Sequence, residues 1–167
     1  MKNINIFCFG FGQVAKNFIK KLIIEKYNIK LTVTSRNESS KEKFNGINFN
    51  NYLFNGDKFD NNLVGELKEA DHILVSIPPE KQEDLVVKNF SKFIKGSRVR
   101  WITYLSATSV YGDHKGEWVN EDSETKPTSF NGIARLKAEN SWLSLQMSKN
   151  LPLQIFRLSG IYSNEKN

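Results

Sequence analysis

Two glycines and an alanine near the start of the chain have the spacing of a turn that can cradle phosphate groups. The segment GFGQVA, residues 10–15, follows the apolar run INIFCF and opens a stretch of helical periodicity. The first glycine would permit a tight turn, and the second would let backbone amides and the helix start approach a pyrophosphate. The alternative is a plain strand-to-helix turn that uses glycine. The residues expected to bind a dinucleotide here are Gly10, Phe11, Gly12, Gln13 and Val14.

A polar pair at the end of KLTVTS could select the form of that dinucleotide. An acidic residue at this place would hydrogen-bond the ribose hydroxyls of NAD, but the sequence has Ser35 and Arg36. A hydroxyl and a guanidinium suit a 2′-phosphate, so we expect NADP or NAD, with NADP favoured. Arg36 could equally be a solvated loop residue. Ile77 and Pro78, in SIPP, would lie at the same ligand-binding edge of the sheet, or would simply end a strand.

The elements that must position these residues alternate between short apolar runs and helical patterns. This alternation is typical of βαβ units, so we predict an α/β, Rossmann-like doubly wound parallel sheet with helices on both faces. In the first helix, Val14, Phe18 and Leu22, with Ile19 and Ile23 beside them, are expected to pack on the sheet. SKEKF is expected to be helical or irregular. Strands are expected at INIFCF, KLTVTS, INFNNYLF, HILVSI, RVRWITYLS and LPLQIFRLSGIY, and helices at about 12–26, between SIPP and about 94, and at about 128–147.

Composition excludes several classes of protein. The 167 residues are 39% hydrophobic, which suffices for one ordinary core, and we find no apolar window long enough to span a membrane. The net charge of +6 comes from lysines scattered among glutamates, so no nucleic-acid partner is expected. Cys8 has no partner for a disulfide, and the carboxylates around His114 match no calcium or zinc pattern. We expect a cytoplasmic protein without a metal site, in which the three tryptophans serve mainly for packing.

Three segments carry a family resemblance, and the most specific of them is LSATSVYG with EDS and KPTS downstream, because that order of strand, VYG turn, acidic loop and Pro-led helix is hard to obtain by chance. The three segments are GFGQVA near the start, YLSATSVYGDHKGEWVNEDS after the fifth strand, and FRLSGIY near the end. Together they resemble the extended short-chain dehydrogenase/reductase family, and especially its sugar-nucleotide epimerase/dehydratase-like members. The resemblance implies a Rossmann domain that binds NAD or NADP, and hydride transfer on a small-molecule substrate such as a sugar nucleotide.

The resemblance also implies three catalytic roles, and this sequence has altered residues at all three positions. The family uses a Tyr as general acid/base, a Lys four residues later, and a Ser or Thr that orients the substrate. The Lys matters because a phenol with an ordinary pKa of about 10 is a poor base near neutral pH. In FNGIARLKAE, aligned on Gly132 and Glu139, Asn131 occupies the Tyr position and Arg135 the Lys position. Ala107 occupies the Ser or Thr position.

The altered residues favour cofactor binding over catalysis. Asn131 cannot transfer a proton, whereas Arg135 could still hold a ribose hydroxyl or a phosphate. Ser106 and Thr108 could replace the missing hydroxyl and contact a substrate. Two interpretations stay open. One is an NAD(P)-binding protein with weak or altered oxidoreductase activity on a sugar-nucleotide-like substrate, and the other is a catalytically silent nucleotide-binding or sensor protein, or a truncated remnant.

Members of this family continue well past the RLSGIY strand into a smaller domain that holds the substrate. In this sequence only a few residues follow that strand. We therefore expect residues 1–167 to form the NAD(P)-binding domain, with the substrate domain largely absent. Sheet surface that the missing part would cover should then be exposed or paired, which suggests a homo-oligomer or a partner chain.

Overall fold

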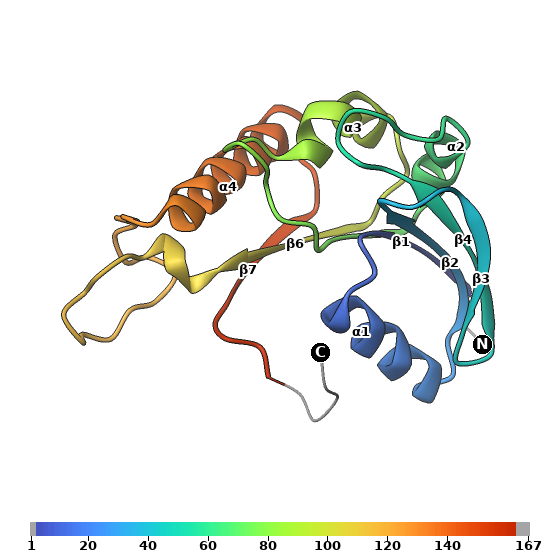
Figure 1. The fold of residues 1–167 in the computed structure, drawn as a ribbon, viewed down its shortest axis with the longest axis horizontal. Helices are drawn as coiled ribbons and strands as arrows, with labels where there is room; N and C mark the ends of the chain where they lie inside the picture. The colour runs from blue at the N-terminus through green and yellow to red at the C-terminus, as the bar shows by residue number, and fades with distance from the viewer. Residues whose placement is uncertain (1–2, 163–167) are drawn as a thin grey trace.

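The computed structural model describes residues 3–162, whose strands form one seven-stranded sheet (Figure 1). The strand order is β3-β4-β2-β1-β5-β6-β7, and among the described strands only β3 and β4 pair antiparallel. The predicted α/β doubly wound sheet is confirmed. The strands are β1 (Asn3–Phe9), β2 (Asn28–Ser35), β3 (Ser40–Phe44), β4 (Ile47–Leu53), β5 (His72–Val75), β6 (Trp101–Ala107) and β7 (Leu153–Leu158).

Helices cover both faces of the sheet (Figure 1). The helix α1 (Gln13–Ile24) lies on one face, and α2 (Leu63–Lys68), α3 (Leu85–Lys95) and α4 (Phe130–Lys149) lie on the other. Alternate residues of β1 serve the two resulting cores: Phe7 and Phe9 pack among the three helices, while Ile6 and Cys8 pack towards α1. A short 3-10 helix, η1 (Thr108–Val110), follows β6.

The carboxyl end of β1 is the point where the order of the strands reverses. β1 pairs with β2 on one side and with β5 on the other. The chain first adds β2, β3 and β4 on one side of β1 and then adds β5, β6 and β7 on the other. In open α/β sheets, ligands bind in the crevice at such a point, outside the carboxyl ends of the strands. The fold therefore puts the turn that follows β1 at the expected ligand-binding place.

One local prediction was wrong, and a second was correct in part. SKEKF is the strand β3, joined to β4 by a tight turn at Asn45 and Gly46, whose φ angles are +46° and +86°. Four of its five residues are exposed, so no apolar alternation marked it, although Asn-Gly is a strong hairpin signal. In α1 the buried residues are Ala15 and Ile19, whereas Phe18 stays 36% exposed. Ile19 belongs to the predicted stripe, and Val14, Leu22 and Ile23 are partly buried and pack against the same core, so the prediction holds except at Phe18.

A long loop, residues 112–128, extends away from the sheet between η1 and α4 (Figure 1). Its base is closed by a bridge between Gly112 and Lys126. Trp118 is 99% exposed on this loop, so the prediction that it packs was wrong, whereas Trp142 is fully buried. Within residues 3–162, no helix has the length and apolar character needed to cross a membrane.

Candidate functional site

Gly10 occupies a position that only glycine fits. Its φ of +85° is one that side chains rarely adopt, and a Cβ there would lie 2.8 Å from Ile77 Cγ2 and 2.8 Å from Ser76 Oγ. Ser76 donates both its N–H and its hydroxyl to the Phe9 carbonyl, and the Gly10 N–H donates to Thr34 Oγ1. The turn after β1 is therefore held between β2 and the loop that follows β5.

Gly12 lies in open space. It is the N-cap of α1, its φ of −81° suits any residue, and no side chain caps the helix there. A Cβ at Gly12 would meet no heavy atom within 4 Å. The first turn of α1 also carries no acidic side chain that would offset the partial positive charge of the helix start. A negatively charged ligand could thus approach the free N–H groups closely.

A cavity of about 210 Å³ adjoins this turn, at the carboxyl ends of β1, β2, β4 and β5. It is smaller than the roughly 300–1,000 Å³ of pockets that enclose whole drug-sized ligands. One end of a dinucleotide could occupy it. Six of the sequence-predicted residues line this cavity: Gly10, Phe11, Ser35, Arg36, Ile77 and Pro78.

Sequence reasoning missed the other half of the lining. The missed residues include the segment 54–56 after β4, and Glu80 and Leu85 from the loop after β5 and the start of α3. Gly56 has a φ of +94°, and a Cβ there would lie 3.1 Å from Leu85 Cδ1. A signal existed, because β4 is parallel to β2 and its carboxyl end must reach the same edge of the sheet.

Ser35 and Arg36 both line the cavity, but they differ in their hydrogen-bond partners and in their exposure. The Ser35 hydroxyl oxygen accepts hydrogen bonds from the Asn37 N–H at 3.2 Å and from Asn51 Nδ2 at 3.0 Å. Its own hydrogen stays available to donate to a ligand. The Arg36 side chain is 75% exposed, and its Nη2 lies 3.1 Å from Glu80 Oε1. Arg36 is therefore a partnered residue and not merely a solvated one.

The remaining predicted residues of the turn lie beside the cavity. Gly12, Gln13 and Val14 form the start of α1, where their backbone groups face the switch point, but none of them lines the cavity. The Val14 side chain lines a separate apolar groove on the α1 side of the sheet. Any contact that these residues make with a ligand would come from their N–H groups.

The start of α4 is tightly packed against η1. Ser129 caps the helix by accepting the Gly132 N–H at 3.1 Å, and a Cβ on Gly132 would lie 2.6 Å from the Ser109 carbonyl oxygen. Asn131, at the position where the resemblance expects a tyrosine, is exposed. Glycine at 132 is thus required by the packing, whereas residue 131 is free to vary.

Arg135 points into the protein. Its Nη1 donates to the Leu105 carbonyl at 2.7 Å and to Tyr104 Oη at 3.2 Å, and its guanidinium lies 5.9 Å from the centre of the Tyr104 ring. Tyr104 is fully buried, and this burial raises its pKa to about 12 despite the nearby cation. A phenol of this kind cannot replace the missing tyrosine as a base near neutral pH.

Three residues at the end of β6 have different environments. Ala107 is half-buried and Thr108 is exposed at the start of η1. Ser106 is only 4% exposed, and its Oγ is one of two buried side-chain polar atoms without a hydrogen-bond partner in the described part of the chain. This burial argues against the predicted contact between Ser106 and a substrate. Of Ser106 and Thr108, the two predicted substrate contacts, only Thr108 is exposed to solvent.

A buried ion pair ties α4 to β7. Glu139 is 1% exposed, and Arg157 donates to both of its carboxylate oxygens, with the shortest bond at 2.9 Å. The Arg157 guanidinium also lies 4.8 Å from the centre of the Tyr111 ring and donates to the Glu121 carbonyl at 3.4 Å. The pKa of Arg157 is raised, mainly by the hydrogen bonds to Glu139. The pair holds α4, β7 and the long loop together.

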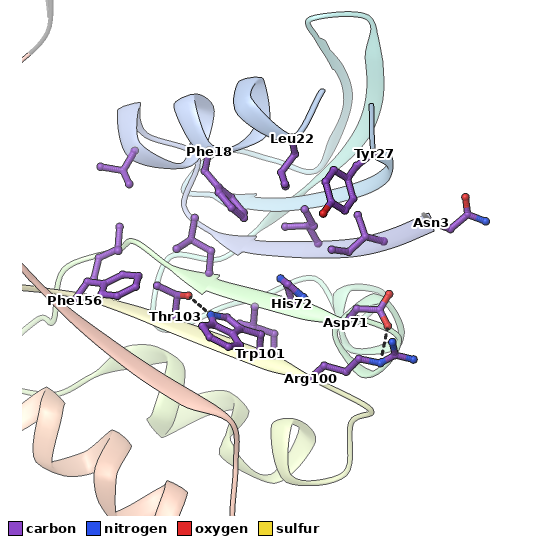
Figure 2. A pocket seen from close by; sticks show the side chains of 16 residues that line it. Asn3, Phe18, Leu22, Tyr27, Asp71, His72, Arg100, Trp101, Thr103 and Phe156 are labelled. Atoms are coloured by element: carbon purple, nitrogen blue, oxygen red, sulfur yellow. Dashed lines mark hydrogen bonds and ion pairs between the residues drawn. The ribbon is translucent and has the colours of Figure 1, made fainter. Parts of the chain in front are cut away.

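A larger apolar groove lies on the α1 side of the sheet (Figure 2). Figure 2 shows Phe18 and Leu22 of α1 on one side of it and Trp101 and Phe156 on the other. Asn3, His72 and Trp101 line it and are the first residues of β1, β5 and β6, so the groove reaches the amino ends of the strands. It is therefore separate from the turn at the carboxyl edge.

This groove offers little chemistry. Trp101 Nε1 is bonded to Thr103 Oγ1, and the His72 ring stacks on the indole at 6.5 Å between centroids. Burial lowers the pKa of His72, although Asp71 acts in the opposite direction. Trp101 is 39% exposed and Phe156 is 47% exposed, so apolar surface is left uncovered on this face by the described residues. The homo-oligomer or partner chain expected from the sequence stays a prediction.

Comparisons with known proteins find similarity at the level of structure. No protein-family model matches the sequence, and no curated protein matches it. A functionally unknown conserved protein from Silicibacter pomeroyi has a solved structure that is 30% identical, with a TM-score of 0.75. The match covers 95% of this chain and 53% of that one.

Two sugar-nucleotide epimerases are also similar. UDP-glucuronic acid 4-epimerase from Bacillus cereus, in complex with NAD, is 17% identical over 95% of this chain and 57% of that one, with a TM-score of 0.75. UDP-N-acetylglucosamine 4-epimerase from Methanobrevibacter ruminantium, in complex with UDP-N-acetylmuramic acid, is 19% identical over 94% of this chain and 55% of that one, with a TM-score of 0.75. The chain has the fold of these epimerases. It spans about half the length of each of them.

Proposed function

We propose that this chain binds a nicotinamide dinucleotide across the carboxyl edge of its sheet. The observation that carries the proposal is Gly12: a helix start without a side-chain cap, with open space where a side chain would be, beside a cavity lined by the ends of four strands. The Bacillus cereus epimerase of the same fold has NAD in its solved structure, which supports the choice of ligand.

Each part of the site has a defined role in this proposal. Gly10 shapes the turn, and the N–H groups of Gly12, Gln13 and Val14 bind the diphosphate. The adenosine end enters the 210 Å³ cavity.

The walls of the cavity hold the adenosine end by shape and by two polar groups. Phe11, Ile77 and Pro78 supply apolar surface. The Ser35 hydroxyl donates its free hydrogen to the ribose, and Arg36 offers a cation to a 2′-phosphate when the ligand is NADP. This arrangement supports both forms of the cofactor, with Arg36 as the reason to favour NADP.

The chemistry that a bound nicotinamide supplies is hydride transfer, and we propose weak or altered oxidoreductase activity on a sugar-nucleotide-like substrate. The chain's own residues limit how this could proceed. Asn131 moves no proton, and the buried Tyr104 is an unsuitable base. The second candidate is a catalytically silent nucleotide-binding protein, in which Arg135 serves only the internal contacts that it makes here.

The proposal also concerns the extent of the cofactor-binding domain. We propose that residues 1–167 act as one NAD(P)-binding domain, and that the substrate domain of the family lies outside it. The observation that this chain spans about half the length of similar structures supports this division.

Thermal unfolding with NADPH, with NADH and without ligand tests the proposal. A ligand that binds only the folded state stabilises it by about 2.7 kcal/mol when present at 100 times its Kd, which gives a clear rise in Tm. No rise with either cofactor would overturn the proposed function. Oxidation or reduction of the bound nicotinamide by UDP-sugars would then separate the two candidates, since the silent protein gives stabilisation without turnover.

A further inference from the structure

A carboxylate lies against the cation that we assign to the ribose end of the cofactor. Glu80 Oε1 is 3.1 Å from Arg36 Nη2, and both residues line the same cavity. Glu80 comes from the loop after β5, whereas Arg36 directly follows β2. The pair therefore spans the cavity wall from one side of β1 to the other.

The backbone holds Glu80 firmly in this place. Glu80 and Glu83 exchange two backbone hydrogen bonds, of 3.0 and 2.8 Å, around a two-residue turn. Lys81 and Gln82 in that turn have φ values of +46° and +65°, which non-glycine residues adopt only when their surroundings enforce it. Asp84, which follows Glu83, is buried and caps α3 through the N–H groups of the helix start.

We propose that Glu80 sets the preference of the site between NAD and NADP. This inference rests on the dinucleotide site proposed above. A 2′-phosphate at Arg36 would have to displace the Glu80 carboxylate and would be repelled by it, whereas a ribose hydroxyl could donate a hydrogen bond to it. Glu80 thus supplies, from the loop after β5, the acidic group that the end of β2 lacks at Ser35.

The consequence is a site in which two opposite charges compete. Arg36 alone would favour NADP strongly, and Glu80 counteracts this by neutralising the guanidinium. The pair is largely exposed, with 75% and 44% of the two side chains accessible, so it contributes little to folding. Removal of Glu80 should therefore change the selectivity of the site and leave the fold intact.

The test compares two pairs of ligands, and the members of each pair differ only in the 2′-phosphate. Affinities of 2′,5′-ADP and 5′-AMP, and of NADPH and NADH, are measured by calorimetry for the wild type, Glu80→Gln and Glu83→Gln. We expect Glu80→Gln to raise the affinity ratio of the 2′-phosphorylated ligand over its partner by about ten-fold. Glu83→Gln makes the same chemical change in the same turn, but Glu83 pairs with Lys88 and does not line the cavity, so its ratio should match the wild type.

A third variant connects the effect to Arg36. In Arg36→Ala the additional change Glu80→Gln should raise the ratio by less than it does in the wild type, because neutralisation of the guanidinium no longer contributes and only the direct effect of the carboxylate on the 2′-phosphate and the ribose hydroxyl is left. An unchanged ratio in Glu80→Gln, with both ligands still bound, would overturn the inference and leave the proposed function intact. An equal rise in Glu83→Gln would also overturn it, since a general charge effect would then suffice. If the wild type and all variants bind none of the four ligands, the proposed function fails and the inference fails with it.

Discussion

The turn after β1 and the start of α4 are the two places where a dinucleotide-dependent enzyme of this fold would do its work, and they are built differently here. Around Gly12 the chain leaves space and free N–H groups, which only a ligand would use. Around Arg135 the chain fills the space itself, since the guanidinium is bonded to a strand carbonyl and to a buried phenol. The turn after β1 is thus open to a ligand, whereas the inner side of α4 is occupied by the protein's own side chains.

The largest effect that would sharpen this comparison comes from Gly10→Ala. A Cβ at Gly10 clashes with Ile77 and Ser76 and forces an alanine to a φ of +85°. We expect a loss of about 4 kcal/mol in the free energy of unfolding, from overpacking and backbone strain together. Urea denaturation measures it, and a loss below about 1 kcal/mol would contradict the tight turn.

The polar network beneath α4 should give the next largest effect. Asp84 caps α3 through Val86 and Val87 and accepts the Trp142 indole N–H at 3.1 Å. Asp84→Ala removes the cap and leaves a buried donor without a partner, at a cost of about 3 kcal/mol. Thermal or urea unfolding checks the value, and a near-neutral result would show that the region around α4 is held by packing alone.

Asp84 should also make the stability of the protein depend on pH. Burial raises the pKa of Asp84 above its ordinary value of 3.8, so the folded protein binds its proton more readily than the unfolded chain. The ionised carboxylate is then penalised in the folded state, and this penalty decreases as the pH falls through the raised pKa towards 3.8. The free energy of unfolding of the wild type, relative to that of Asp84→Asn, should therefore increase as the pH is lowered through the raised pKa towards 3.8, which urea denaturation at a series of pH values measures.

Arg135→Met separates an internal role from a cofactor contact. The substitution leaves the Leu105 carbonyl and the Tyr104 hydroxyl without their donor, so we expect a loss of about 2 kcal/mol in stability. Dinucleotide affinity should change by less than about two-fold at a temperature where the variant is folded. A loss of affinity well beyond this would show that Arg135 reaches the ribose, as the resemblance implied.

Asn131→Tyr should have the smallest effect. The side chain at 131 is exposed in the first turn of α4, so the change in stability should stay within about 0.5 kcal/mol. The new phenol lacks a lysine four residues later, so we expect no turnover of bound nicotinamide with UDP-sugars. Turnover in this variant would mean that the site around α4 retains more of the catalytic arrangement than its contacts indicate.

The sequence was informative where function depends on backbone and local spacing. The spacing of Gly10, Gly12 and Ala15 predicted the turn between β1 and α1, because the strand, the turn and the helix follow each other within a few residues. Contacts between distant residues were not predictable from the pattern. Glu80 meets Arg36 across 44 positions, and Arg135 meets Tyr104 across 31. Both contacts depend on where loops and helices come to lie on the sheet.

We infer that residue 12 is glycine because a dinucleotide needs the space beside it, and Gly12→Ala fills that space with a methyl group. The Cβ would meet no heavy atom within 4 Å, so the variant should fold, with a loss of at most about 1 kcal/mol from an alanine at the helix N-cap. Gly65→Ala is the matched control, since Gly65 of α2 also has open space at its Cβ position and lies outside the site. Calorimetric titration with NADPH and NADH should show at least a roughly ten-fold loss of affinity in Gly12→Ala and none in Gly65→Ala. Equal affinity in Gly12→Ala and the wild type would mean that no dinucleotide occupies the space beside Gly12.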